Sequence, residues 1–158
     1  MSGKGFYVAQ DGHVVNILPP VDITGGKFSD VFSMKNHAHA TIIIQVGVSA
    51  AAWTKIIVNA CDDFVPSNRT AIPFKLHPQE TALGDVIAAR EDVAAAGRTP
   101  SANDNIFYVI EIDAAELPAG KPNLELSLTN GSNSVIASAI AILSGARYAQ
   151  DQSPTAIA

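Results

Sequence analysis

One stretch of this chain, residues 40–63 (ATIIIQVGVSAAAWTKIIVNACDD), constrains the fold more than any other. Residues 41–48 and 54–61 are both rich in β-branched side chains, which favour the pleated surface of a β-sheet over a helix. Residues 49–53, which separate them, have about the length of a longer hairpin loop. The sequence therefore predicts two buried strands that fold back on each other as a central hairpin.

Further apolar runs, separated by turn residues, predict strands along most of the chain. The strand candidates are residues 6–9, 13–18, 29–34, 41–48, 54–61, 71–76, 106–113, 123–129 and 133–144. In the last of these, Val135 and three alanines fall on one face and three isoleucines on the other. Such a series predicts an all-β fold: an antiparallel β-sandwich, with a jelly roll as one form of it and at most one short helix. We expect one domain over residues 1–158, with residues 1–5 and 151–158 flexible or ordered by a partner.

Turn residues indicate how the strands connect. Asp11-Gly12 predicts a hairpin between residues 6–9 and 13–18, and Asn130-Gly131 predicts one after residues 123–129. Pro19-Pro20 should end pairing of the second strand, because proline has no N–H to donate to a sheet. Pro73 places its strand at an edge or a bulge.

Residues 80–97 are ambiguous. Their alanine, leucine, glutamate and arginine content favours a helix, whereas Gly84 interrupts that pattern and the other elements are strands. A strand over residues 85–90, flanked by loop, is the preferred interpretation, and a helix is the alternative. Residues 98–105 (RTPSANDN) predict a loop, and residues 114–120 predict one helical turn.

Composition limits the kinds of partner. The net charge of −5 argues against wrapping nucleic acid, which needs a basic surface. Only 16% of the residues are charged, as expected of a chain that forms subunit interfaces, although an apolar-rich monomer would look the same. Residues 1–15 lack the long apolar core of a signal peptide, and no apolar run approaches the roughly 18 residues that span a bilayer, so we expect a soluble protein made in a cytoplasm.

The residues that could carry chemistry do not form a recognisable motif. His37 and His39 share a strand face, but His13, His77 and Cys61 lack the paired spacing of a zinc site. Glu111 and Asp113 also share a face, at a strand end where solvated carboxylates are common. Cys61 precedes two aspartates, which disfavour a reactive thiolate. We therefore predict no catalytic residue, no metal and no cofactor.

Trp53, at the tip of the predicted hairpin, allows two interpretations. An exposed indole could stack on a sugar or anchor a partner protein. Alternatively, the side chain folds back as a lid on the sandwich. The first interpretation would fit a glycan-binding β-sandwich, and the second has only a structural role.

Six short fragments follow one another in a characteristic order, namely QVGV (45–48), ACDD (60–63), TAIPF (70–74), FYVIEID (107–113), AILS (141–144) and Arg147-Tyr148. This series, which covers roughly residues 30–150, resembles small structural proteins encoded among the head genes of tailed bacteriophages. Most such proteins decorate the capsid, and some are neck or tail components. The resemblance implies a β-rich, often trimeric module that binds the major capsid protein on the outer face of the expanded head, with no catalytic motif.

On this interpretation the chain is a decoration or cement protein located on the virion. Its contacts are expected in the irregular segments 1–5, 98–105 and 151–158, which could become ordered on a neighbour. The candidate contact residues are Trp53, Arg98, Asn103, Asp104, Tyr148 and Gln150. The alternatives are a neck or tail component and a glycan-binding sandwich; an enzyme comes last, because no nucleophile, base and orienting group can be assembled.

Overall fold

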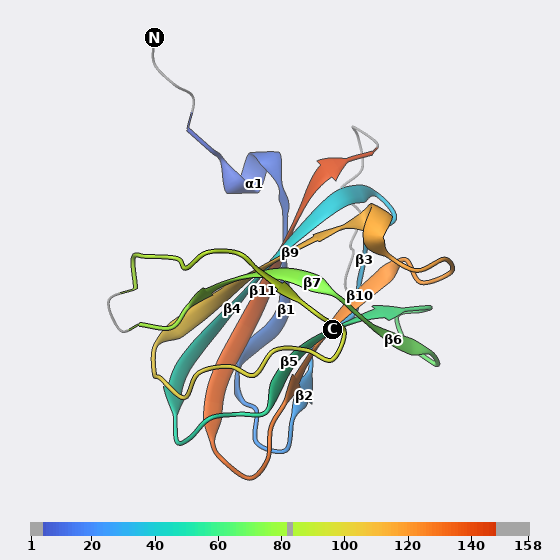
Figure 1. The fold of residues 1–158 in the computed structure, drawn as a ribbon. Coiled ribbons are helices and arrows are strands. Elements are labelled where there is room, and N and C mark those ends of the chain that lie inside the picture. The colour runs from blue at the N-terminus through green and yellow to red at the C-terminus, as the bar shows by residue number, and fades with distance from the viewer. Residues whose placement is uncertain (1–4, 82–83, 148–158) are drawn as a thin grey trace.

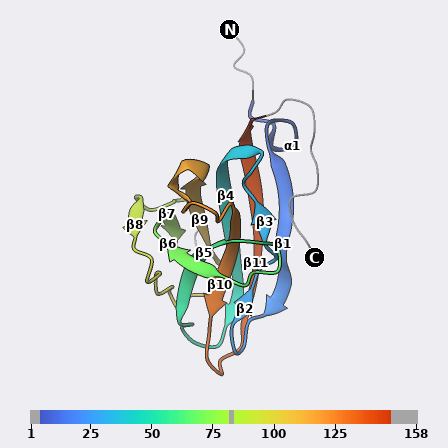
Figure 2. The same ribbon diagram turned by 90° about the vertical axis from the view of Figure 1, so that its right-hand side faces the viewer.

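Two antiparallel β-sheets packed face to face form the protein in a computed structural model that describes residues 5–81 and 84–147 (Figure 1). The predicted all-β sandwich is confirmed. The helical elements among the described residues are one short α-helix, α1 (Val8–Asp11), and one 3-10 turn, η1 (Ala114–Glu116). Both views place α1 at one end of the sandwich, next to the start of the first strand (Figure 1 and Figure 2).

The two sheets contain six and five strands. The first has the order β1-β11-β4-β9-β7-β8, and the second has the order β2-β10-β5-β6, with β3 also pairing with β10. The strands of the first sheet are β1 (His13–Asp22), β11 (Val135–Ala146), β4 (His37–Ser49), β9 (Ile106–Asp113), β7 (Phe74–Gln79) and β8 (Glu91–Val93). Those of the second sheet are β2 (Lys27–Phe28), β10 (Asn123–Thr129), β5 (Lys55–Cys61), β6 (Arg69–Ile72) and β3 (Phe32–Ser33).

Eight of these strands follow the order of a jelly roll. When β3, β7 and β8 are set aside and the rest are numbered along the chain, the sheets read 1-8-3-6 and 2-7-4-5. This is the arrangement of two interlocked Greek keys. β7 and β8 extend the first sheet beyond β9.

The predicted central hairpin is wrong. β4 pairs with β11 and β9, whereas β5 pairs with β10 and β6, so the two halves of residues 40–63 lie in different sheets. Both strands are buried and β-branched because their inner faces meet in the core, where Ile44 and Ile56 are fully buried. A short connection can cross between sheets stacked about 10 Å apart as well as join neighbouring strands, so loop length did not separate the two cases.

The same error affects the turn at Asn130-Gly131. The bounds of β9 and β10 match residues 106–113 and 123–129 as predicted. However, β10 lies in the five-stranded sheet and β11 in the six-stranded sheet, so the turn joins the layers instead of closing a hairpin.

The N-terminal prediction is also corrected. Residues 8–11 form α1 instead of a strand, and no hairpin forms at Asp11-Gly12. β1 continues through Pro19-Pro20 to Asp22, with register irregularities between Leu18 and Val21. β1 is an edge strand, and the irregular register takes Pro19-Pro20 out of the regular pairing with β11, so their missing N–H groups are tolerated.

Two further segments differ from the sequence predictions. Residues 84–90 are neither strand nor helix, and the strand in this region is β8, which begins at Glu91. Pro73 separates β6 from β7, which belong to different sheets, so the single strand predicted over residues 71–76 is two. Residues 98–105 form a loop, and η1 is the predicted helical turn, both as expected.

The alternation predicted for β11 is confirmed and determines what the sheet exposes. Val135 and the alanines at 137, 139 and 141 are buried in the core. Ile136 and Ile140 point away from the core and are exposed. The outer face of the six-stranded sheet therefore carries the isoleucines of this strand, with Ser138 between Ile136 and Ile140.

Candidate functional site

Trp53 is buried at the connection between β4 and β5. Its side chain is 1% exposed, and its Nε1–H has no hydrogen-bond partner among the described residues. The interpretation of Trp53 as an exposed platform for a sugar or partner is wrong, and the interpretation as a lid on the sandwich is confirmed. The sequence did not separate them because a connection between strands can point its aromatic residue outward or inward.

Arg98 takes part in an ion-pair cluster within the chain. Its guanidinium group contacts Glu80, with Nη2 3.2 Å from Oε2, and Nε lies 3.2 Å from Glu91 Oε2. The Tyr108 hydroxyl donates to Glu80 Oε1 at 2.6 Å. Burial would raise the pKa of Glu80, but the hydrogen bonds from Arg98 and Tyr108 lower it overall. Burial and the Glu80 carboxylate raise the pKa of Tyr108. Arg98 is thus engaged inside the chain.

The other predicted contact residues of this loop are also fixed to the scaffold. Asn103 Nδ2 donates to the backbone oxygen of Glu80 at 2.7 Å, and Asp104 Oδ1 accepts from the Ser49 N–H at 2.7 Å. Arg98, Asn103 and Asp104 therefore hold the loop against β4 and the segment after β7. Tyr148 and Gln150 lie outside the described residues, as do segments 1–4 and 151–158.

The histidines and the cysteine do not gather into a metal centre. No group of three or more His, Cys, Asp or Glu side chains suited to a metal occurs in residues 5–81 and 84–147. His37 is buried and stacks on His13, with ring centroids 5.9 Å apart. Burial raises the pKa of the Cys61 thiol to about 11, and Glu125 adds to this, so Cys61 is a neutral core thiol.

His39 forms a cluster that the sequence patterns did not reveal. Its Nε2 lies 2.6 Å from Glu111 Oε2, and its Nδ1 lies 2.7 Å from Asp113 Oδ1. Thr41 donates to the same Glu111 oxygen at 2.7 Å. The sequence shows an i, i+2 spacing for His37 and His39 on β4 and for Glu111 and Asp113 on β9. Only the pairing of His39 with Asp113 brings the histidine and the two carboxylates together. The cluster thus combines acidic and basic groups with the Thr41 hydroxyl, whose hydrogen is donated to Glu111.

The outer face of the six-stranded sheet carries an apolar patch. The register places Ile140 beside Ile43, and Ile43 beside Val109, in one row across β11, β4 and β9. Val14, Ile136 and Ile140 are 46%, 39% and 38% exposed, respectively. The members of this outer patch are Val14, Ile43, Phe107, Val109, Ile136, Ile140 and Ile142.

The outer face of the five-stranded sheet has a different character. There, Glu125 is buried and forms an ion pair with Arg69, with Nε 2.7 Å from Oε2. Arg69 also lies over the Phe28 ring, 5.0 Å from its centroid. Asn123 and Ser127 are buried beside Glu125 on β10. On this face a buried ion pair lies beside an exposed aromatic ring, since Phe28 is 57% exposed, whereas the outer patch is aliphatic along β11.

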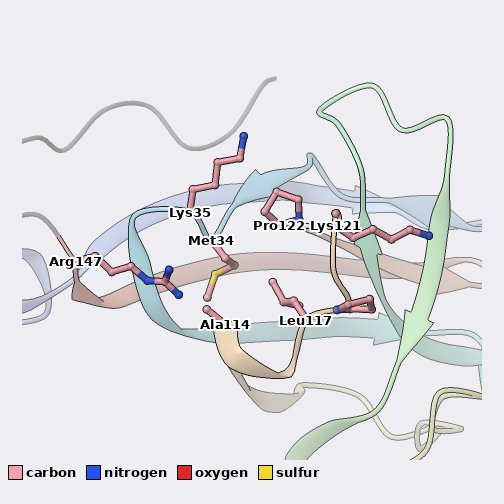
Figure 3. A pocket seen from close by; sticks show the side chains of 9 residues that line it. Met34, Lys35, Ala114, Leu117, Lys121, Pro122 and Arg147 are labelled. Carbon is pink, nitrogen blue, oxygen red and sulfur yellow. The ribbon is translucent and has the colours of Figure 1, made fainter.

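A pocket of about 240 Å³ lies where η1 and the start of β10 meet the turn before β4 (Figure 3). Met34, Ala114 and Leu117 meet at its centre, with Lys35 and Arg147 on one side and Lys121 on the other. The remaining lining residues are Pro118, Gly120 and Pro122. The three cations are far apart in the sequence, so no local pattern could have predicted the pocket.

Comparisons with known proteins do not identify the chain: no family model and no curated protein matches it. Among the described residues, no helix is long and apolar enough to cross a membrane. The class that the fold and site define is therefore a jelly-roll β-sandwich with an apolar outer sheet face and a basic pocket.

Proposed function

We propose that this chain is a non-enzymatic structural protein of a bacteriophage virion, a capsid decoration protein that binds the outer face of the expanded head. The observation that carries the proposal is the outer patch on the six-stranded sheet. The head-gene resemblance of the sequence supports the same assignment, and jelly rolls are common in viral capsid proteins. Its partners are the major capsid protein and two further copies of itself, and it is made in the bacterial cytoplasm before it joins the particle.

The outer patch suits a permanent protein contact. Its central row, Ile140-Ile43-Val109, is continued by Asn16 on one side and His77 on the other. Apolar centres with polar rims are typical of protein interfaces. Exposed isoleucines grouped on one sheet face are unusual for an isolated domain and indicate a binding surface.

The stabilising mechanism follows from mass action. A protein that binds only the expanded lattice lowers the free energy of that state by its binding free energy at each occupied site. Association into trimers would combine several weak contacts into one tight attachment. No bond is made or broken, so the function needs no catalytic group and no cofactor.

The copy number in purified particles of the source phage tests the proposal. Gel densitometry against the major capsid band should give about one copy per capsid subunit. A few copies per particle would instead assign the chain to the neck or tail, and absence from the particle would contradict a virion role.

Variants test whether the outer patch makes the contact. Ile140→Asp should weaken attachment to undecorated expanded heads at least tenfold, because it places a charge in the centre of the apolar row. Val65→Asp is the control, since Val65 is 83% exposed on a loop outside the patch. Equal attachment of both variants would exclude the outer patch as the contact.

A further inference from the structure

The pocket beside η1 combines an apolar floor with unbalanced positive charge. Met34 is buried at its base, and Leu117 packs against the core from the η1 side. Pro122 accepts a backbone hydrogen bond from Met34 at 2.9 Å, which fixes the two sides of the floor together. The floor is therefore formed before any ligand arrives.

Ion pairing across the rest of the molecule makes the charge of this pocket distinctive. The sequence has ten lysines and arginines, of which Lys4 lies outside the described residues. Four of the others form ion pairs with carboxylates, namely Arg69, Lys75, Arg90 and Arg98. Lys35, Lys121 and Arg147 form none with a described carboxylate, and all three line this pocket. A chain of net charge −5 thus places around one hollow three of the five described cations that have no described carboxylate partner.

The side chains are arranged as two rims. Lys121 Nζ contacts Thr70 Oγ1 on β6 and lies 3.1 Å from the Oδ1 atom of Asn68, which precedes that strand. Both are neutral acceptors. On the other side the Arg147 backbone N–H donates to the Asn36 oxygen at 2.9 Å, which fixes this end of β11 beside the turn that carries Lys35. Figure 3 shows Lys35 and Arg147 on one side of the floor and Lys121 extending away from it on the other. An occupant of the floor would therefore have Lys35 and Arg147 as its nearest positive charges on that side.

We propose that this pocket binds an acidic peptide segment of a partner protein, with one apolar side chain on the Met34–Leu117 floor and carboxylates beside Arg147 and Lys35. Charge complementarity identifies the occupant, because a neutral apolar ligand would leave the cations unused. Carboxylates gain charge-assisted, often bidentate, hydrogen bonds from an arginine, and an apolar anchor supplies contact area. The assignment deepens the proposed function. It rests on that function only for the identity of the protein that supplies the acidic segment.

Peptide binding to the full-length protein tests the assignment. The probe is a fluorescein-labelled octapeptide of seven glutamates around one central leucine, followed by anisotropy at 0.1 M salt. A lysine-for-glutamate version of the same peptide is the reference. The acidic peptide should bind at least tenfold more tightly than the basic one, and the affinity should fall as salt rises. Equal binding of the two peptides, or none, would overturn the proposal.

Charge-matched variants locate the binding site. The double change Lys35→Glu with Arg147→Glu should weaken binding of the acidic peptide at least tenfold. Lys27→Glu with Lys55→Glu makes the same change in net charge at two cations outside the pocket and should leave binding within twofold. Equal losses in the two double variants would show general charge attraction and overturn the pocket.

Two further measurements establish which segment occupies the pocket and whether the pocket contacts the capsid. If Asp151→Asn binds the acidic peptide and the natural chain does not, the occupant is the chain's own C-terminal segment, and the partner assignment is wrong. Attachment of the pocket variant to expanded heads is measured in parallel. If the pocket variant loses peptide binding but attaches normally to expanded heads, the pocket binds the peptide and is not the capsid contact. If neither the natural chain nor any variant attaches to expanded heads, the proposed function is contradicted and the pocket assignment is not.

Discussion

His39 on β4 contacts its diagonal neighbour Glu111 on β9, with the imidazole Nε2 2.6 Å from the carboxylate Oε2. Because Asp113 contacts the other ring nitrogen, only the protonated imidazole can donate to both carboxylates at once. Burial lowers the pKa of His39, but the two carboxylates raise it more, and the net direction is upward from 6.5. The pair therefore couples the stability of the six-stranded sheet to pH.

The first prediction concerns this coupling. A raised folded-state pKa means that the stabilisation from His39 is complete below pH 6.5, the value for the unfolded chain, and is lost as the pH rises through the folded-state value. The free energy of unfolding of the natural protein minus that of His39→Gln should thus be larger at pH 5.5 than at pH 8.5. Urea unfolding at both pH values measures it. A difference that does not change with pH would contradict the prediction. The comparison with the variant also cancels the opposite contribution of His37, whose pKa is lowered by burial and by His13.

The second prediction concerns the Arg98 cluster. Arg98→Met should destabilise the protein by about 2 kcal/mol, because it leaves the part-buried Glu80 carboxylate without its cation. Arg90→Met is the matched control, since Arg90 pairs with Asp92 at the surface and such pairs contribute about 0–1 kcal/mol. Denaturant midpoints measure both variants. Equal effects would mean that Arg98 holds its loop no more firmly than a surface pair does.

The third prediction concerns two glycines with the same backbone conformation. Gly97 (φ +83°) and Gly120 (φ +77°) are both in the left-handed region, where an alanine costs about 1–2 kcal/mol. At Gly97 an added Cβ would also lie 2.5 Å from the Ile56 oxygen, whereas at Gly120 nothing lies within 4 Å. Gly97→Ala should therefore destabilise more than Gly120→Ala in thermal unfolding. The reverse order would show that the contact with β5 is not close.

The fourth prediction separates structure from recognition at Trp53. Trp53→Ala should lower the free energy of unfolding by about 3–5 kcal/mol, because it empties a fully buried site. Trp53→Phe, which refills most of the space, should lose clearly less. Chemical unfolding monitored by circular dichroism measures both. A change below about 1 kcal/mol for the alanine variant would contradict the buried position of the indole.

The sequence predicted strands far better than it predicted their partners. Residues 106–113 and 123–129 match β9 and β10 to the residue, because alternation and β-branching are local properties of a strand. Whether a strand pairs with the next one depends on contacts distant in the chain, such as Ile44 with Tyr108 and Ala139. Turn residues such as Asn130-Gly131 fit both a hairpin and a connection between the two sheets, so they do not show whether consecutive strands pair with each other.

The candidate site shows the same division. Alternation alone predicted that the isoleucines of β11 share a face, but not that this face points outward. The row with Ile43 and Val109 required the register of three strands. The basic pocket could not be predicted, since Lys35, Lys121 and Arg147 come from separate turns and strand ends. The exposure of Trp53 could not be predicted, because burial of a side chain in a connection depends on how the opposing sheet packs against it.

The pairing of β1 with β11 joins the first and last strands of the fold. During synthesis, β1 leaves the ribosome without a sheet partner, and β4 lacks one neighbour, until residues 135–146 have been translated. The five-stranded sheet also forms late, since its central strand β10 is complete only after residue 129 has been translated. The growing chain must therefore keep its apolar strands apart for most of its translation, and a ribosome that stalls before residue 135 releases open strand edges prone to aggregation.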